Sequence, residues 1–152
     1  GESRIDLPFL PEAAVKVVEP FGPVEHATPT KVTVLQPGTD ERGLHHDLVS
    51  NRHSLRIFRD DGRYRIDAIG TEIGYSKLKE VSIVGDDPLS MREVVATSHR
   101  FQRDDWNARL DTRIVMTCDR DNFILNSDVD AWNGDERIFS RSYHHKIPRD
   151  NM

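Results

Sequence analysis

The residues of this sequence that could do chemistry are its seven histidines, its single cysteine and a group of carboxylates near the C-terminus. Histidines occur as pairs at His45-His46 and His144-His145, a pattern that suggests a metal site. Adjacent residues of a strand point to opposite faces, however, so each pair offers one ligand per face. Neither a His-x-His motif nor a second cysteine completes a ligand set. We therefore expect solvated or interfacial histidines and no bound metal.

A second group, Asp128, Asp130, Asp135 and Glu136, is dense enough in carboxylates to suggest a calcium loop. It lacks the twelve-residue spacing, the central glycine and the terminal glutamate that such a loop requires. Asp128 and Asp130 also fall on the outward face of a predicted strand. We expect these two carboxylates to solubilise that face or to pair with arginine on a neighbouring strand.

Nucleophiles and cofactor motifs are the next candidates. A catalytic serine would need a strained Gly-x-Ser-x-Gly turn, which this sequence does not contain. Cys118 falls on the apolar side of its predicted strand, so we expect a small buried hydrophobic residue there. Glycines occur singly rather than in a phosphate-binding loop. We expect no catalytic residue and no cofactor in this chain, with Trp106 in the core and Trp132 either in the core or at an interaction surface.

The 152 residues match the length of one domain, and 36% of them are hydrophobic while 31% are charged. No apolar run approaches the roughly 18 to 20 residues that cross a bilayer, and none follows a basic start as in a secretory signal. We therefore expect a soluble, cytoplasmic protein. The net charge of −5 argues against a nucleic-acid-binding face. Because the chain begins with Gly1 instead of methionine, we expect a fragment or a trimmed chain.

Two regions differ in composition. Prolines crowd into the first 29 residues, at positions 8, 11, 20, 23 and 29, where each removes an amide donor and favours extended backbone. We predict a proline-rich linker or extended arm over residues 1–29, in which residues 11–18 could form two helical turns. Residues 30–152 alternate apolar and polar side chains and are predicted to form an antiparallel β domain.

The clearest predicted strand runs from Trp106 to Cys118, where apolar residues alternate with polar ones. Others are predicted at residues 31–36, 46–49, 54–60, 63–69, 75–84, 89–102 and 123–131 and from Arg137 onward. Hairpin turns are expected at residues 60–62, 85–88, 119–122 and 133–134. Consecutive strands joined by short turns pair antiparallel, so the C-terminal half is predicted to be a four-strand meander. The predicted fold is all-β, with roughly eight or nine strands in a curled antiparallel sheet or open barrel of calycin-like or sandwich type.

Several segments resemble the extreme C-terminal region of CocE/NonD-type serine hydrolases, relatives of cocaine esterase and X-prolyl dipeptidyl-peptidase. They include residues 86–90 (DDPLS), 105–106 (DW), 113–117, 131–139 (AWNGDERIF) and 147–150 (IPRD), with further similarity at residues 47–50 and 59–64. The similarity covers roughly residues 44 to 150 and falls at turns and strand ends. It implies that the Ser, Asp and His triad belongs to an α/β-hydrolase domain upstream, with a β-rich jelly roll, and that no catalytic position lies in this chain.

Three functions remain open at this point. The first is a non-catalytic accessory domain of such a hydrolase, a peptidase or esterase, serving packing, oligomerisation or the shaping of substrate access, with the upstream domain of the same chain or a second copy as partner. The second is an independent lipocalin-like binder of small ligands, whose inward faces would enclose a cavity. The third, a small enzyme, would need charged residues converging from faces that the pattern makes apolar.

Overall fold

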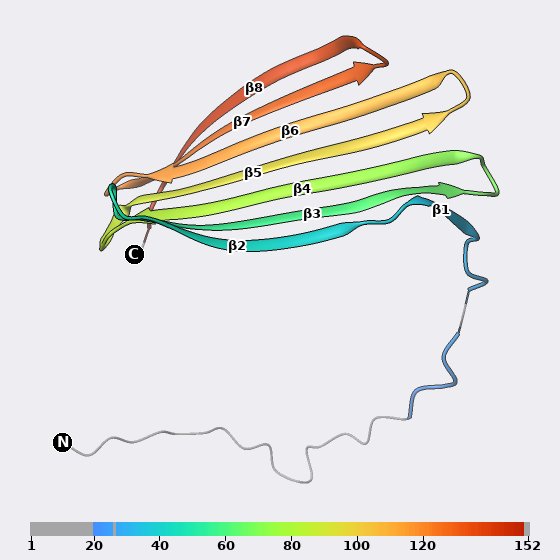
Figure 1. Cartoon of the computed structure of the whole chain (residues 1–152), viewed down its shortest axis with the longest axis horizontal. Helices are drawn as coiled ribbons and strands as arrows, with labels where there is room; N and C mark the ends of the chain where they lie inside the picture. The colour runs from blue at the N-terminus through green and yellow to red at the C-terminus, as the bar shows by residue number, and fades with distance from the viewer. Residues whose placement is uncertain (1–19, 26, 151–152) are drawn as a thin grey trace.

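Residues 20–25 and 27–150 are described by the computed structural model, and they form a single antiparallel sheet of eight strands (Figure 1). The strands are β1 (Val32–Gln36), β2 (Thr39–Asp47), β3 (Arg52–Ile66), β4 (Thr71–Val84), β5 (Asp87–Arg103), β6 (Trp106–Cys118), β7 (Asn122–Asn133) and β8 (Glu136–Pro148). Their order across the sheet is β1-β3-β4-β5-β6-β7-β8, and β2 also pairs with β3. The predicted all-β fold and the curled antiparallel sheet are confirmed.

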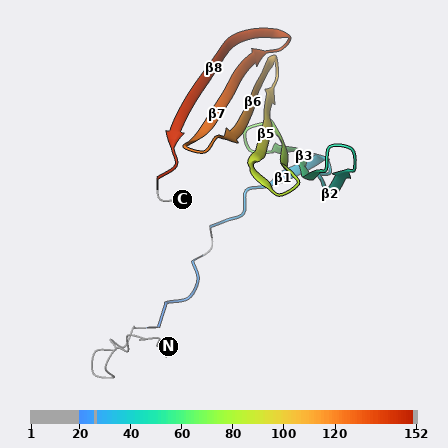
Figure 2. The ribbon, with the colours of Figure 1, turned by 90° about the vertical axis from the view of Figure 1, so that its left-hand side faces the viewer.

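The sheet is one open layer. Its edges, β8 on one side and β1 with β2 on the other, stay apart, and the strands twist progressively from one edge to the other (Figures 1 and 2). Long strands twist strongly because the preferred backbone angles of L-residues rotate each strand against its neighbour. Of the two forms predicted from the sequence, the structure has the curled sheet and not the barrel. A second packed layer, as in a sandwich, is absent from the described residues.

The C-terminal half is the predicted four-strand meander, β5 to β8. Its hairpins turn through Asp104-Asp105 and Gly134-Asp135, and Gly134 has a positive φ of 58°. The β6–β7 turn is organised by Asp119, whose carboxylate accepts hydrogen bonds from the backbone amides of Asp121 (2.8 Å) and Asn122 (2.7 Å). The turns predicted at residues 119–122 and 133–134 are thus confirmed.

The hairpin predicted at residues 60–62 is wrong. Strand β3 runs straight through these residues, and the register with β4 shifts between Asp60 and Arg63, which marks a β-bulge. The bulge lies where β1 ends and β2 begins, on the other side of β3. Gly62 has a φ of 75°, and a Cβ there would overlap the carbonyl oxygen of Gln36. A bulge of this kind uses a glycine with positive φ, as a tight turn does, and the Asp60 carboxylate accepts a 2.8 Å hydrogen bond from the Gly62 amide, so the same local pattern suits both structures.

The position of strand β2 also differs from the prediction. Residues 46–49 were predicted as a strand, but β2 occupies Thr39–Asp47 and the chain then turns. Asp47 causes this ending, because its carboxylate accepts hydrogen bonds from the Val49 amide (2.9 Å) and the Ser50 hydroxyl (2.6 Å). Residues 20–25 and 27–31 form neither helix nor strand, whereas the helical turns predicted at residues 11–18 lie outside the described residues.

The sheet has two chemically different faces. Residues directly opposite each other on paired strands share a face. We call the side that carries Trp106, Leu110, Ile114 and Cys118 the apolar face, and the other side the polar face. On the neighbouring strands the apolar face continues through Leu55, Ile57, Tyr64, Ile73, Tyr75, Val81, Val95, Phe101, Phe123, Leu125, Val129, Phe139, Tyr143 and Ile147.

Nothing covers the apolar face within the described residues, and none of their hydrophobic side chains is buried. Two sequence-based expectations are therefore corrected. Trp106 is 47% exposed at the end of β6, stacked at 6.3 Å on Phe101, and does not lie in a core. Cys118 is only half-buried. Both side chains point to the apolar face as predicted, but a single layer leaves that face open.

Candidate functional surfaces

The apolar face is the first candidate, and it is hollowed at the end of the sheet where β2, β3, β4 and β5 meet. A hollow of about 450 Å³ is lined by hydrophobic side chains that include Leu44, Leu55, Val81 and Met91. Leu44 is 87% exposed. Farther along the same face the ion pair between Lys79 and Glu93, 2.8 Å long, interrupts the hydrophobic surface. Apart from His46 and His53, the described residues of this face offer packing area and no convergent reactive groups.

Histidines are also among the residues that line this hollow. His46 and His53 are directly opposite each other on β2 and β3, and their rings stack with centroids 3.9 Å apart. His46 also shares a 2.8 Å hydrogen bond with the side chain of Asn51. The second pair divides between faces, and His144 forms a 2.7 Å hydrogen bond with Asn126 on the polar side. Within the described part of the chain, no group of three or more His, Cys, Asp or Glu residues could hold a metal ion.

Two of the carboxylates near the C-terminus, Asp128 and Asp130, lie on the polar face, as their alternation predicts. Asp130 pairs with Arg137 of β8 at 3.5 Å, and Asp128 accepts a 2.7 Å hydrogen bond from the Ser142 hydroxyl. The expected pairing with a neighbouring arginine is confirmed for Asp130, and a hydroxyl takes that place for Asp128.

A row of cationic side chains crosses the polar face from one edge of the sheet to the other. The cross-strand register aligns one residue from each strand except β2, and we call the set the arginine row: Gln36, Arg63, Gly74, Arg100, Arg109, Trp132 and Arg137. Sequence reasoning missed this row, because its members are scattered over a hundred residues and only the strand register brings them together.

At one end of the arginine row, Trp132 is enclosed by guanidinium groups. The Arg109 guanidinium carbon lies 4.5 Å from the Trp132 ring centroid and that of Arg137 lies 5.9 Å away, both within the range of cation–π attraction. Arg109 Nε is also 2.9 Å from an Asp111 carboxylate oxygen, close enough for an ion pair but without a hydrogen bond. Trp132 thus lies in a filled cluster on the polar face.

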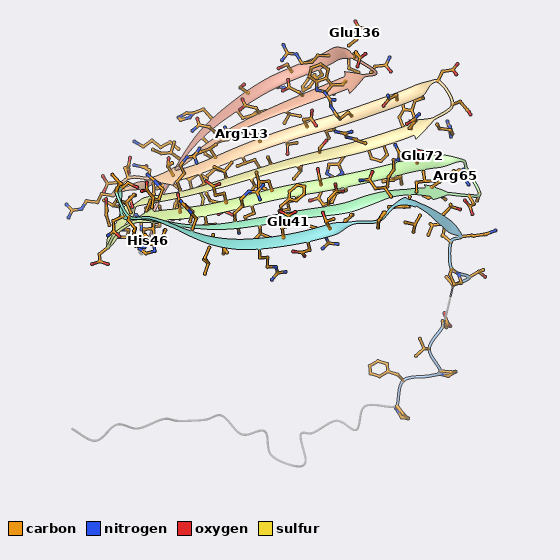
Figure 3. The ribbon with its side chains drawn as sticks, viewed as in Figure 1. Glu41, His46, Arg65, Glu72, Arg113 and Glu136 are labelled. Carbon is orange, nitrogen blue, oxygen red and sulfur yellow. The ribbon has the colours of Figure 1, made fainter. Side chains whose placement is uncertain are left out.

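At the middle of the arginine row the surface is hollowed instead. A depression of about 310 Å³ lies over Gly74, with Arg63 and Arg100 on its two sides. Arg63 makes a 3.5 Å ion pair with Glu72. Glu72 lies near the β3–β4 hairpin (Figure 3). Ser98 on its floor donates a 2.8 Å hydrogen bond to Asp111. This depression, which we call the Gly74 hollow, is lined mainly by polar and charged residues.

Perturbed carboxylates mark turns and strand ends rather than either hollow. The Asn122 side chain and the Asp121 amide hold the pKa of Asp119 below its ordinary value, with a smaller contribution from Lys146. The Thr33 hydroxyl, 2.8 Å away, lowers the pKa of Asp67. Both carboxylates are half-buried and lie in turns or at strand ends, so their hydrogen bonds stabilise local structure.

Comparison with known protein families, with curated proteins and with solved structures found no match to this chain. None of the described residues belongs to a helix long and apolar enough to cross a membrane.

Proposed function

We propose that this chain is a non-catalytic accessory β domain of a CocE/NonD-type α/β-hydrolase, and that its apolar face packs against the upstream domain of the same parent chain. The observation that carries the proposal is the uncovered apolar face. A sheet that is hydrophobic on one side gains most of its stability by burying that side against a second layer. No such layer exists among the described residues, and this supports a partner as the source of it.

The turn and strand-end motifs support the choice of partner. Residues 86–90 and 131–139, which resemble the C-terminal region of those hydrolases, form the β4–β5 and β7–β8 hairpins and hold the ends of the apolar strands in register. In this role the domain stabilises the hydrolase, supports its oligomerisation or shapes access to a substrate site that lies in the other domain.

The experiment begins with the reading frame upstream of Gly1, where a Gly-x-Ser-x-Gly turn is expected. The upstream segment and this chain are then expressed separately and mixed, and sedimentation velocity measures their association. We expect a stoichiometric complex with a higher midpoint of thermal inactivation for its esterase activity than the upstream segment alone. Two components that sediment separately, or an upstream frame without a hydrolase motif, would contradict the proposal.

The lipocalin-like alternative is favoured by one observation, the 450 Å³ apolar hollow beside Leu44. The open sheet provides a single wall there, whereas a lipocalin encloses its ligand on all sides. A fluorescent fatty acid distinguishes the two functions: saturable binding that an unlabelled fatty acid displaces supports the binder, and its absence supports the accessory domain.

A further inference from the structure

We propose that the Gly74 hollow on the polar face binds a small anionic group, a carboxylate or a phosphate, through the guanidinium group of Arg100, with Arg63, which also pairs with Glu72, on the opposite side of the hollow. This site lies on the opposite side of the sheet from the apolar face, and its argument does not depend on the proposed hydrolase partner.

The first step is the glycine itself. Gly74 lies inside β4, where glycine weakens a strand because it has no side chain to pack and loses more backbone freedom on folding. Its φ is not positive, and an added Cβ would make only ordinary contacts, 3.4 Å from the Gly62 carbonyl oxygen and 3.7 Å from the Arg100 Cβ. Neither conformation nor crowding therefore requires glycine here. Because Gly74 has no side chain, a depression is left at its position.

The second step is the charge around the depression. Of its charged lining groups, Arg63 and Glu72 pair with each other, and Asp60 is a second carboxylate, which accepts a 2.8 Å hydrogen bond from the Gly62 amide and keeps its negative charge. Arg100 is exposed and has no ion-paired or hydrogen-bonded carboxylate among residues 20–25 and 27–150. It is the cation at this site whose charge is left without a partner.

The third step is geometry. Arg63 and Arg100 are the direct cross-strand neighbours of Gly74 on its two sides. Neighbouring strands are about 4.8 Å apart, so the two arginine backbones lie roughly 10 Å apart across an empty position. Long side chains from both sides can converge on one group held between them. A guanidinium offers two parallel N–H donors that match the oxygen spacing of carboxylate and phosphate, and Ser98 and Gln102 add polar atoms to the lining.

The test uses the whole 152-residue chain and saturation-transfer NMR, which observes the methyl protons of a weakly bound probe and tolerates a self-associating protein. The probes are acetate, methyl phosphate and the neutral analogue acetamide, at constant ionic strength. We expect saturable binding of acetate, methyl phosphate or both, and no binding of acetamide. Whichever of acetate and methyl phosphate binds with higher affinity shows whether the site prefers a carboxylate or a phosphate. Equal signals for the anions and acetamide would overturn the proposal.

Three variants locate the site. Arg100→Gln removes the unpaired guanidinium, and we expect affinity for the anion to fall about tenfold or more. Gly74→Val fills the hollow with a residue that suits a strand, so we expect the anion to be lost while the thermal midpoint is unchanged or higher. Arg113→Gln is the matched control. Arg113 lies on β6, on the same polar face of the sheet as Arg100, and away from the hollow (Figure 3). If Arg100→Gln and Arg113→Gln lost the same amount of affinity for the anion, a defined site would be refuted, whether or not Gly74→Val folds and binds.

Discussion

Ile114 and Val115 provide the sharpest test of the uncovered face, because they are neighbours in the middle of β6 that point to opposite sides. Ile114 lies between Val95 and Ser127 on the apolar face, whereas Val115 lies between Val94 and Asn126 on the polar face. Replacing each in turn by aspartate makes nearly the same chemical change one residue apart. Ile114→Asp places a carboxylate where a partner would pack, and Val115→Asp does not.

The magnitude follows from exposure. Ile114 is 37% exposed, and burying a whole isoleucine side chain contributes about 1.5–3 kcal/mol, so covering the remaining part contributes about 0.6–1.1 kcal/mol. A buried carboxylate without a partner costs about 3–5 kcal/mol more. Association through this face should therefore weaken by about 4–6 kcal/mol, or roughly a thousandfold or more.

Sedimentation velocity and the fluorescence of a dye that binds exposed hydrophobic surface provide the assay. Without its partner, we expect the wild-type chain to self-associate through the apolar face and to bind the dye. Val115→Asp should behave in the same way, and Ile114→Asp should sediment as a monomer, with circular dichroism confirming that both variants keep the sheet. A monomeric wild-type chain, or equal behaviour of the two variants, would refute the reasoning.

Two further predictions concern stability. Gly62→Ala should lower the free energy of unfolding by at least about 1–2 kcal/mol, because alanine disfavours the positive φ and its Cβ would overlap the Gln36 carbonyl. Urea denaturation measures this change. The control is Gly43→Ala, whose Cβ would meet nothing within 4 Å and which should cause no loss of stability. The carboxylate of Asp119 should stabilise the fold above an unfolded-state pKa of about 3.9 and lose this contribution as pH falls through its lower folded-state pKa. Asp119→Asn should therefore make the urea midpoint less dependent on pH below about 4, and an unchanged pH dependence would argue against the hydrogen bonds assigned to this turn.

The parts of the fold that follow from local chemistry were predictable. Alternation around Trp106 predicts a strand and assigns its apolar side, and Asn133-Gly134 predicts the tight turn between β7 and β8. Local signals fail where the same residue pattern suits two kinds of backbone conformation. Asp60-Asp61-Gly62 suits a hairpin and a bulge equally, and the choice depends on β1 and β2 meeting at the far side of β3.

The candidate sites also divide into features that follow from the sequence and features that depend on the tertiary structure. By itself the sequence determines the antiparallel strands, the amphipathic alternation and the division of the histidines between faces, because a strand alternates its side chains with a period of two wherever it lies. Only the tertiary structure decides that the sheet remains one open layer, which leaves Trp106 and Cys118 partly exposed. It also brings Arg63, Gly74 and Arg100 together, because the pairing register between strands depends on contacts between residues far apart in the chain, and no local pattern records those contacts.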